Sequence, residues 1–244
     1  MGVQRLQAVG LRIFGIDVRA LAAFRIGAGL ILLGDLVVRG QYLTAHYTDL
    51  GILPRSARML FYDQGANSRY WWSLHMLGGH QIAQLALFLL AAWFAVWLVI
   101  GYRTQLATVV SWILLTSLHS RNPTLLQGGD TMLRCLLFWA MFLPLGAAWS
   151  VDRAVAGGRR TEPRIFTAAT TAILLQVAMV YWCTAAYKMP QSLWTGNYTA
   201  VYYALHVDQF ATLFGQWLRQ FPAPLAVLTF ATVGLETAGP LLAF

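Results

Sequence analysis

The sequence predicts an all-α integral membrane protein, a polytopic bundle of about six transmembrane helices. Two observations carry this prediction. Hydrophobic residues make up 58% of the 244 positions and charged residues only 11%, whereas about 25% of the residues of a soluble domain are charged. Long apolar runs also recur along the chain, separated by polar loops. So few charges cannot cover a water-facing surface, and lipid removes the need for them.

Six apolar runs are candidates to cross the roughly 30 Å of bilayer hydrocarbon. They are residues 20–38, 82–100, 106–118, 132–148, 166–187 and 224–244, and the third is short. None alternates polar and apolar residues as a membrane β-strand does, so helices are expected. Without a linker or an internal repeat, residues 1–244 are expected to form a single transmembrane domain. The last run reaches Phe244 with no polar flank, which is what a fragment of a longer protein would show.

The arginines predict the orientation, because short cytoplasmic loops are enriched in basic residues. Residues 1–16 are expected to form a cytoplasmic amphipathic basic segment. The N-terminus then lies on the cytoplasmic side of a cell inner membrane. Segments 39–81, 119–131 and 188–223 are then outside and hold most polar clusters. The inside arginines are Arg5, Arg12, Arg103, Arg153, Arg159, Arg160 and Arg164. No basic run accompanies the net charge of +8, so the predicted partner is the lipid bilayer and not nucleic acid.

Lys188 is the most informative single residue, since it is the one lysine beside sixteen arginines. It ends the fifth apolar run. A lysine can lose its proton, whereas a guanidinium in a protein cannot, so this residue type at this place suits a base. The alternative is an interfacial anchor that reaches the headgroups beside Tyr187 and Trp194. Both interpretations stay open.

Charged residues also lie within the predicted spans. Asp130 and Arg134 are four residues apart and can pair on one helix face. Arg25, Asp35 and Glu236 interrupt other apolar runs, and intramembrane charges mark functional sites unless they neutralise one another between helices. The five histidines lack the spacing of metal ligands, so no metal is predicted. His119, at the end of a span, is kept as a site candidate.

Several motifs resemble the horizontally transferred transmembrane (HTTM) domain, the family that includes the membrane part of vitamin K-dependent gamma-carboxylase. The resemblance covers nearly the whole chain. It rests on residues 21–27, 46–49, 51–55, 101–104, 117–123, 128–130, 142–146 and 149–152. It also rests on residues 181–188, which are similar to the carboxylase segment that carries its catalytic lysine. In one departure, Arg121-Asn122-Pro123 stands where the carboxylase has an Asn-Asn-His motif.

The resemblance implies a quinol-dependent, carboxylase-like enzyme with a site on the extracytoplasmic face. Its cofactor would be a reduced quinone similar to vitamin K hydroquinone, and its substrate a secreted peptide or protein. Lys188 is carried over as the base. The remaining predicted site residues are His119, Arg121 and Asp130 as catalytic residues, and Asn122, Arg134, Trp194 and Glu236 as cofactor-binding residues.

Two other functions remain open. The first is a non-enzymatic membrane component for the export or maturation of a secreted peptide, in which the charges only hold helices together. The second is a transporter, in which Asp35, Arg134 and Glu236 mark an ion path. Paired Gly or Pro breaks and inverted repeats, which are typical of transporters, are not visible in the sequence.

Overall fold

The computed structural model describes residues 2–63, 72–157, 162–207 and 211–242. Arg159 and Arg160 of the predicted inside loop therefore lie outside the described residues. The chain divides into two compact units, Met1–Thr170 and Thr171–Phe244, and each unit packs mainly within itself. The expectation of a single domain over residues 1–244 stays a prediction.

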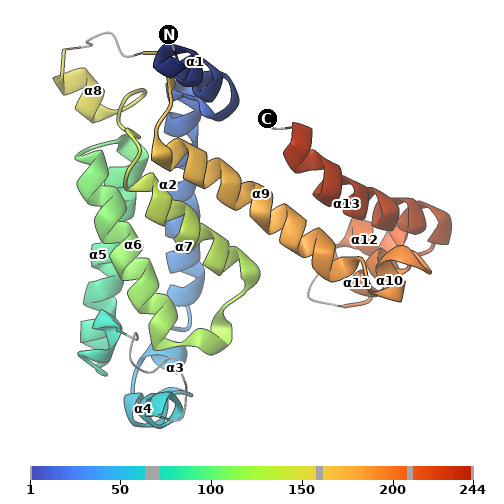
Figure 1. Ribbon diagram of the computed structural model, residues 1–244. Coiled ribbons are helices and arrows are strands. Elements are labelled where there is room, and N and C mark those ends of the chain that lie inside the picture. The colour runs from blue at the N-terminus through green and yellow to red at the C-terminus, as the bar shows by residue number, and fades with distance from the viewer. Residues whose placement is uncertain (1, 64–71, 158–161, 208–210, 243–244) are drawn as a thin grey trace. The chain divides into compact units, whose positions relative to one another are not determined.

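Unit 1 is built around four helices that lie side by side, α2, α5, α6 and α7 (Figure 1). Shorter elements connect them or flank them at either end. In chain order the elements are α1 (Gly2–Phe14), β1 (Ile16–Asp17), α2 (Val18–Gly40), α3 (Leu43–Tyr47), α4 (Arg55–Asp63), η2 (Leu74–Met76), α5 (Gln81–Ile100), α6 (Thr104–Arg121), η3 (Pro123–Leu125), α7 (Gly128–Ala140), α8 (Val151–Val155) and β2 (Arg164–Ile165). The two short strands pair antiparallel, with Ile16 opposite Ile165.

Unit 2 holds most of α9 (Ala168–Lys188), which begins at the end of unit 1, and then α10 (Ser192–Thr195), α11 (Ala200–Ala204), α12 (Leu213–Leu218) and α13 (Pro222–Leu242). α13 packs against α10 and α11. The Trp182 indole N–H of α9 donates to the Thr237 carbonyl oxygen of α13 at 3.2 Å. This bond joins the two long helices of the unit.

Four of the predicted spans are long apolar helices. Within the described residues, α2, α5, α9 and α13 are long and apolar enough to cross a membrane. They correspond to the predicted runs 20–38, 82–100, 166–187 and 224–244. Large apolar side chains on their outer faces are exposed, such as Val37 at 65% and Leu89 at 62%. A bilayer is the surrounding that removes the cost of exposing them.

The other two predicted spans are helices of a different kind. α6 extends past the predicted run 106–118 to 18 residues, and it is less apolar because it buries polar side chains such as Thr108, Ser111 and His119. α7 ends at Ala140, so the predicted run 132–148 is wrong in its second half. Pro144 explains the early end, since proline lacks the N–H of a helix and disfavours helical backbone at the preceding residue.

The inner faces of the four helices form the core of unit 1. Ala28 and Leu32 of α2 pack with Leu98 of α5, Leu115 of α6 and Leu137 of α7, all at most 5% exposed. Small residues let the backbones approach, and Gly29 is one example: a Cβ there would lie 2.6 Å from a Val99 methyl carbon. This packing holds the ends of α2, α6 and α7 close together, where the polar residues collect.

Candidate functional site

A cleft of about 630 Å³ lies between the ends of α2 and α7. One end of the cleft is polar and the rest of its wall is apolar. The polar lining residues are Asp35, Arg39, Tyr42, His46, Gln127 and Asp130, and the apolar ones are Ile31, Val38, Leu125, Met132, Leu133 and Leu136. Such a cavity suits an amphipathic molecule with a small polar group.

Arg39 holds the polar end together. Its Nε lies 2.7 Å from a carboxylate oxygen of Asp35, one turn earlier on α2, and its Nη2 donates to Asp130 Oδ1 at 2.8 Å. Its Nη1 donates to the Tyr47 hydroxyl at 3.2 Å. The Arg39 side chain is only 10% exposed. Two carboxylates against one guanidinium leave this cluster with a formal charge of −1.

Asp130 also lies in the first turn of α7. Its Oδ2 accepts the Gln127 backbone N–H at 2.8 Å, while the Gln127 side chain accepts an N–H of the first turn. This reciprocal arrangement is a capping box, which fixes the side chain of the residue three positions into the helix. The cap therefore positions Asp130 toward Arg39.

The predicted pair of Asp130 and Arg134 is not formed. Asp130 pairs with Arg39 instead, and within the part of the chain that the structure describes Arg134 makes no ion pair. Asp35 likewise pairs with Arg39 of its own helix. Arg39 was not among the predicted site residues, although its spacing of four residues from Asp35 is the same signal that singled out Asp130 and Arg134.

His119 lies directly behind this cluster. Its side chain is fully buried, and its Nε2 is 3.7 Å from Asp130 Oδ1. Among the described residues, neither ring nitrogen has a hydrogen-bond partner. The structure thus brings two predicted catalytic residues, His119 and Asp130, next to each other, and Asp130 lines the cleft.

The side chains of Arg121 and Asn122 donate hydrogen bonds to the backbone of the 46–53 segment. Arg121 Nη1 donates to the Leu53 carbonyl oxygen at 2.8 Å, and the Asn122 amide donates to the His46 carbonyl oxygen at 3.0 Å. Both side chains are buried. Their predicted roles in catalysis and cofactor binding stay predictions, and the contacts present here fix a loop.

Three predicted site residues meet in unit 2. Lys188 Nζ lies 2.5 Å from Glu236 Oε1 of α13 and 4.2 Å from the centre of the Trp194 ring. The side chains of Lys188 and Glu236 are 16% and 15% exposed. Glu236 Oε2 is buried and has no hydrogen-bond partner in the described part of the protein.

This arrangement has definite chemical capabilities. The ring face and the carboxylate both stabilise an ammonium. Glu236 is also the acceptor to which Lys188 can pass a proton, after which the amine is a base. The oxygen Oε2 can accept a hydrogen bond from a bound hydroxyl, since a carboxylate has two acceptor oxygens.

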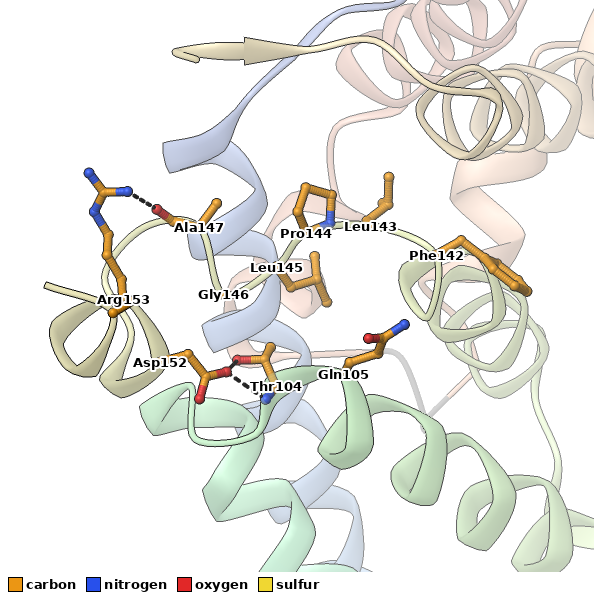
Figure 2. A pocket seen from close by; sticks show the side chains of 11 residues that line it. Thr104, Gln105, Phe142, Leu143, Pro144, Leu145, Gly146, Ala147, Asp152 and Arg153 are labelled. Carbon is orange, nitrogen blue, oxygen red and sulfur yellow. Dashed lines mark hydrogen bonds between the residues drawn. The ribbon is translucent and has the colours of Figure 1, made fainter. Parts of the chain in front are cut away.

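A second large cavity, of about 500 Å³, is lined by the start of α6, the 142–147 segment and α8 (Figure 2). Asp152 Oδ2 accepts the Thr104 backbone N–H at 2.8 Å and its hydroxyl at 2.6 Å, and Oδ1 accepts the Arg103 N–H at 2.7 Å. Burial acts to raise the pKa of Asp152, but these hydrogen bonds and the charge of Arg25 outweigh it and lower the pKa. Asp152 therefore caps α6.

The charged side chains that line this second cavity bind protein groups. Figure 2 shows Arg153 reaching the Ala147 carbonyl oxygen, at 2.8 Å from Nη1. Both carboxylate oxygens of Asp152 are engaged at the start of α6. The cavity is therefore a structural junction, and the candidate sites are the α2–α7 cleft and the surroundings of Lys188.

Comparison with models of known protein families, with curated proteins and with solved structures found no match. The class of protein therefore follows from the fold. Over its described residues the chain is an all-α protein apart from one two-residue strand pair, and four of its helices are long and apolar enough to cross a membrane. Their length and composition support a membrane protein.

Proposed function

We propose that the chain is a multi-pass membrane protein of the HTTM family, with about six transmembrane helices, a cytoplasmic N-terminus and a place in the cell inner membrane. We further propose that it is a quinol-dependent, carboxylase-like enzyme that acts on a secreted peptide or protein, with Lys188 as base. The observation that carries the proposal is the contact of Lys188 with both Glu236 and Trp194.

The residues around Lys188 fit the polar end of a reduced quinone. Such a molecule has an aromatic ring and a hydroxyl group. Trp194 offers a ring face for stacking, Lys188 an amine, and Glu236 Oε2 an unused acceptor oxygen. When bound, a reduced quinone would supply the acidic hydroxyl and the electrons that oxygen accepts in the reaction.

The protein residues would move one proton in a defined order. Lys188 Nζ gives its proton to Glu236 Oε1, which is 2.5 Å away. The resulting neutral amine then accepts a hydroxyl proton from the bound molecule, because a base must lie within hydrogen-bond reach of the proton it takes. The low exposure of both side chains keeps bulk water from competing.

The experiment is oxygen uptake by the purified protein in lipid nanodiscs with a reduced menaquinone. Wild type is expected to consume oxygen. Lys188→Arg keeps the positive charge but cannot act as a base, so uptake should fall at least about 100-fold, in the range that general-base catalysis supplies. Glu236→Gln removes the proton acceptor and should also lower uptake.

Arg164→Lys is the matched control, since it exchanges the same two residue types at an exposed position, and its uptake should equal that of wild type. Lack of uptake by wild type with any reduced quinone would contradict the proposal. Full uptake by the Lys188→Arg protein would show that the protein is an active enzyme but that Lys188 is not its base.

A non-enzymatic component for export or maturation of a secreted peptide is the second candidate. The observation that favours it is that the guanidinium groups of Arg25 and Arg121 donate hydrogen bonds to backbone carbonyl oxygens. Charges used this way hold helices and loops in place. For such a component, Lys188→Arg should leave export of the peptide unchanged, and a stoichiometric peptide or protein should copurify with the chain from the producing cells.

A further inference from the structure

A small cavity inside unit 1 has the size of one water molecule. Its volume is about 20 Å³, and it is lined by Asp35, His75 and Ser111 among apolar residues. A water molecule needs roughly 10–15 Å³ of such space and two to four polar partners. The cavity meets both requirements.

Two of the lining residues have polar atoms without a partner among the described residues. His75 Nε2 and Ser111 Oγ are both buried, and neither makes a hydrogen bond there. The other ring nitrogen of His75, Nδ1, lies 2.6 Å from Ser117 Oγ. Leaving such buried atoms unpaired is unfavourable, so the cavity favours a molecule that both donates and accepts hydrogen bonds.

Asp35 links this cavity to the α2–α7 cleft, because it lines both. On the cleft side its carboxylate binds Arg39. The cluster of Asp35, Arg39 and Asp130 has a formal charge of −1, and one added proton makes it neutral.

From the cavity, hydrogen-bonding groups extend through His75 toward the surface of unit 1. Ser117 Oγ, which contacts His75 Nδ1, lies 3.3 Å from Ser73 Oγ. Ser73 precedes η2 and is partly exposed, whereas His75 and Ser117 are buried. The hydrogen-bonding groups therefore form a continuous series from the cavity to a partly exposed hydroxyl.

We propose that the small cavity binds one water molecule between Asp35, His75 Nε2 and Ser111 Oγ, and that this water completes a proton-exchange path from the α2–α7 cleft through His75 and Ser117 to Ser73. This path is independent of Lys188 and of a quinone. It gives the cavity a ligand, and it gives a proton-conducting role to a histidine that the quinol reaction does not use.

The proton transfers balance in both directions. Protonated Asp35 gives its proton to the water, which passes one of its own to His75 Nε2. His75 releases its Nδ1 proton to Ser117, whose own hydroxyl proton leaves through Ser73. His75 then has its proton on Nε2. Uptake of a proton from solvent runs the same steps in reverse and restores the first tautomer.

Charged and titratable groups of the surrounding elements face this path. They are Arg39 of α2, Tyr47 of α3, His119 and Arg121 of α6, and Asp130 of α7. Burial, followed by the charge of Arg121, lowers the pKa of His75 to about 4. A neutral ring with one N–H and one acceptor nitrogen is the form that the path needs at neutral pH.

The test is solid-state NMR of the full chain in lipid bilayers, with ¹⁵N-labelled histidine and ¹³C-labelled aspartate. His75→Gln assigns the His75 signals. In wild type, magnetisation should pass from water to His75 Nε2. Ser111→Val removes the hydroxyl and fills the cavity, so this transfer should fall at least about fivefold. Thr108→Val is the control, because Thr108 lies about one turn earlier on α6 and its hydroxyl donates to the Thr104 carbonyl oxygen.

The proton path has its own readout, the Asp35 carboxyl ¹³C signal across a pH titration. Wild type should give one averaged signal, whereas Ser111→Val and Ser73→Ala should give separate signals for acid and carboxylate because exchange is slower. Ser73→Ala changes a partly exposed side chain and covers the case in which Ser111→Val fails to fold. Absence of water transfer in wild type, equal transfer in Ser111→Val, or an averaged Asp35 signal in both variants would overturn the proposal.

Discussion

Single charged residues inside the bundle form hydrogen bonds with backbone groups that have no partner within their own helix. Arg25 is fully buried and donates to the carbonyl oxygens of Leu98, Val99 and Trp149 at 2.5–2.7 Å. The first two belong to the last turn of α5, whose carbonyls have no partner within the helix. A guanidinium has five donors and can satisfy several such oxygens at once. An intramembrane arginine therefore does not by itself mark a catalytic site.

His75 should make the stability of the protein depend on pH. Because burial and the charge of Arg121 lower its pKa to about 4, the folded protein keeps the ring neutral while the unfolded chain takes up a proton near pH 6.5. The contribution is complete above pH 6.5 and is lost as the pH falls toward 4. At pH 5 the loss is about 2 kcal/mol.

His75→Gln checks this prediction, since glutamine does not titrate. Unfolding free energies of both proteins are measured in detergent at pH 7 and pH 5. Wild type should lose about 2 kcal/mol more than the variant between the two pH values. Equal losses would show that His75 titrates alike in the folded and unfolded chain.

At the scale of elements, partner choice follows the packing of helices that are distant in the sequence. Asp130 of α7 meets Arg39 of α2, 91 residues away, and not Arg134 one turn later on its own helix. The capping box at the start of α7 and the adjacent end of α2 together decide this. Sequence spacing alone favours the local pair.

A double-mutant cycle distinguishes the two pairs. Asp130→Asn keeps an acceptor for the cap but removes the charge, and it is combined with Arg39→Gln in one cycle and with Arg134→Gln in the other. Unfolding free energies should give a coupling of about 1–3 kcal/mol for the Arg39 cycle and below about 0.5 kcal/mol for the Arg134 cycle. A larger coupling with Arg134 would favour the local pair.

On the scale of the whole unit 1, polar segments gather at two ends of the bundle. At one end Asp152 binds the Arg103 and Thr104 amides and Arg25 reaches Trp149. At the other end Arg121 and Asn122 bind the 46–53 segment. Motifs that are far apart in the sequence thus meet in two groups, one at each end of the bundle. The division into inside and outside segments stays a prediction.

The two ends should lie on opposite sides of the membrane. Single cysteines at Leu50 and Val155, which are 89% and 80% exposed, are introduced after replacing Cys135 and Cys183 by alanine. With the N-terminus cytoplasmic, an impermeant maleimide added to intact cells should label position 50 and not position 155. Inverted vesicles should give the opposite result, and labelling of both positions from one side would contradict the topology.

How much the sequence predicted depends on the range of the interaction. Runs of apolar residues predicted α2, α5, α9 and α13 within two residues at each end described, because hydropathy and helix length are local properties. Lys188 stood out because it is the one lysine in the sequence. The end of α7 at Ala140 was missed although Pro144 signalled it, since the apolar run continues past the helix.

The sequence by itself determined that this is a helical chain with long apolar helices and that its buried charges need partners, because composition and periodicity are sufficient for both. Only the tertiary structure decided the partners: Glu236 and Trp194 for Lys188, Arg39 for Asp130, and backbone carbonyl oxygens for Arg25. Trp194 is only six residues from Lys188, but the other partnerships join elements that are remote in the sequence. Their energies depend on distances of a few ångströms that only helix packing sets.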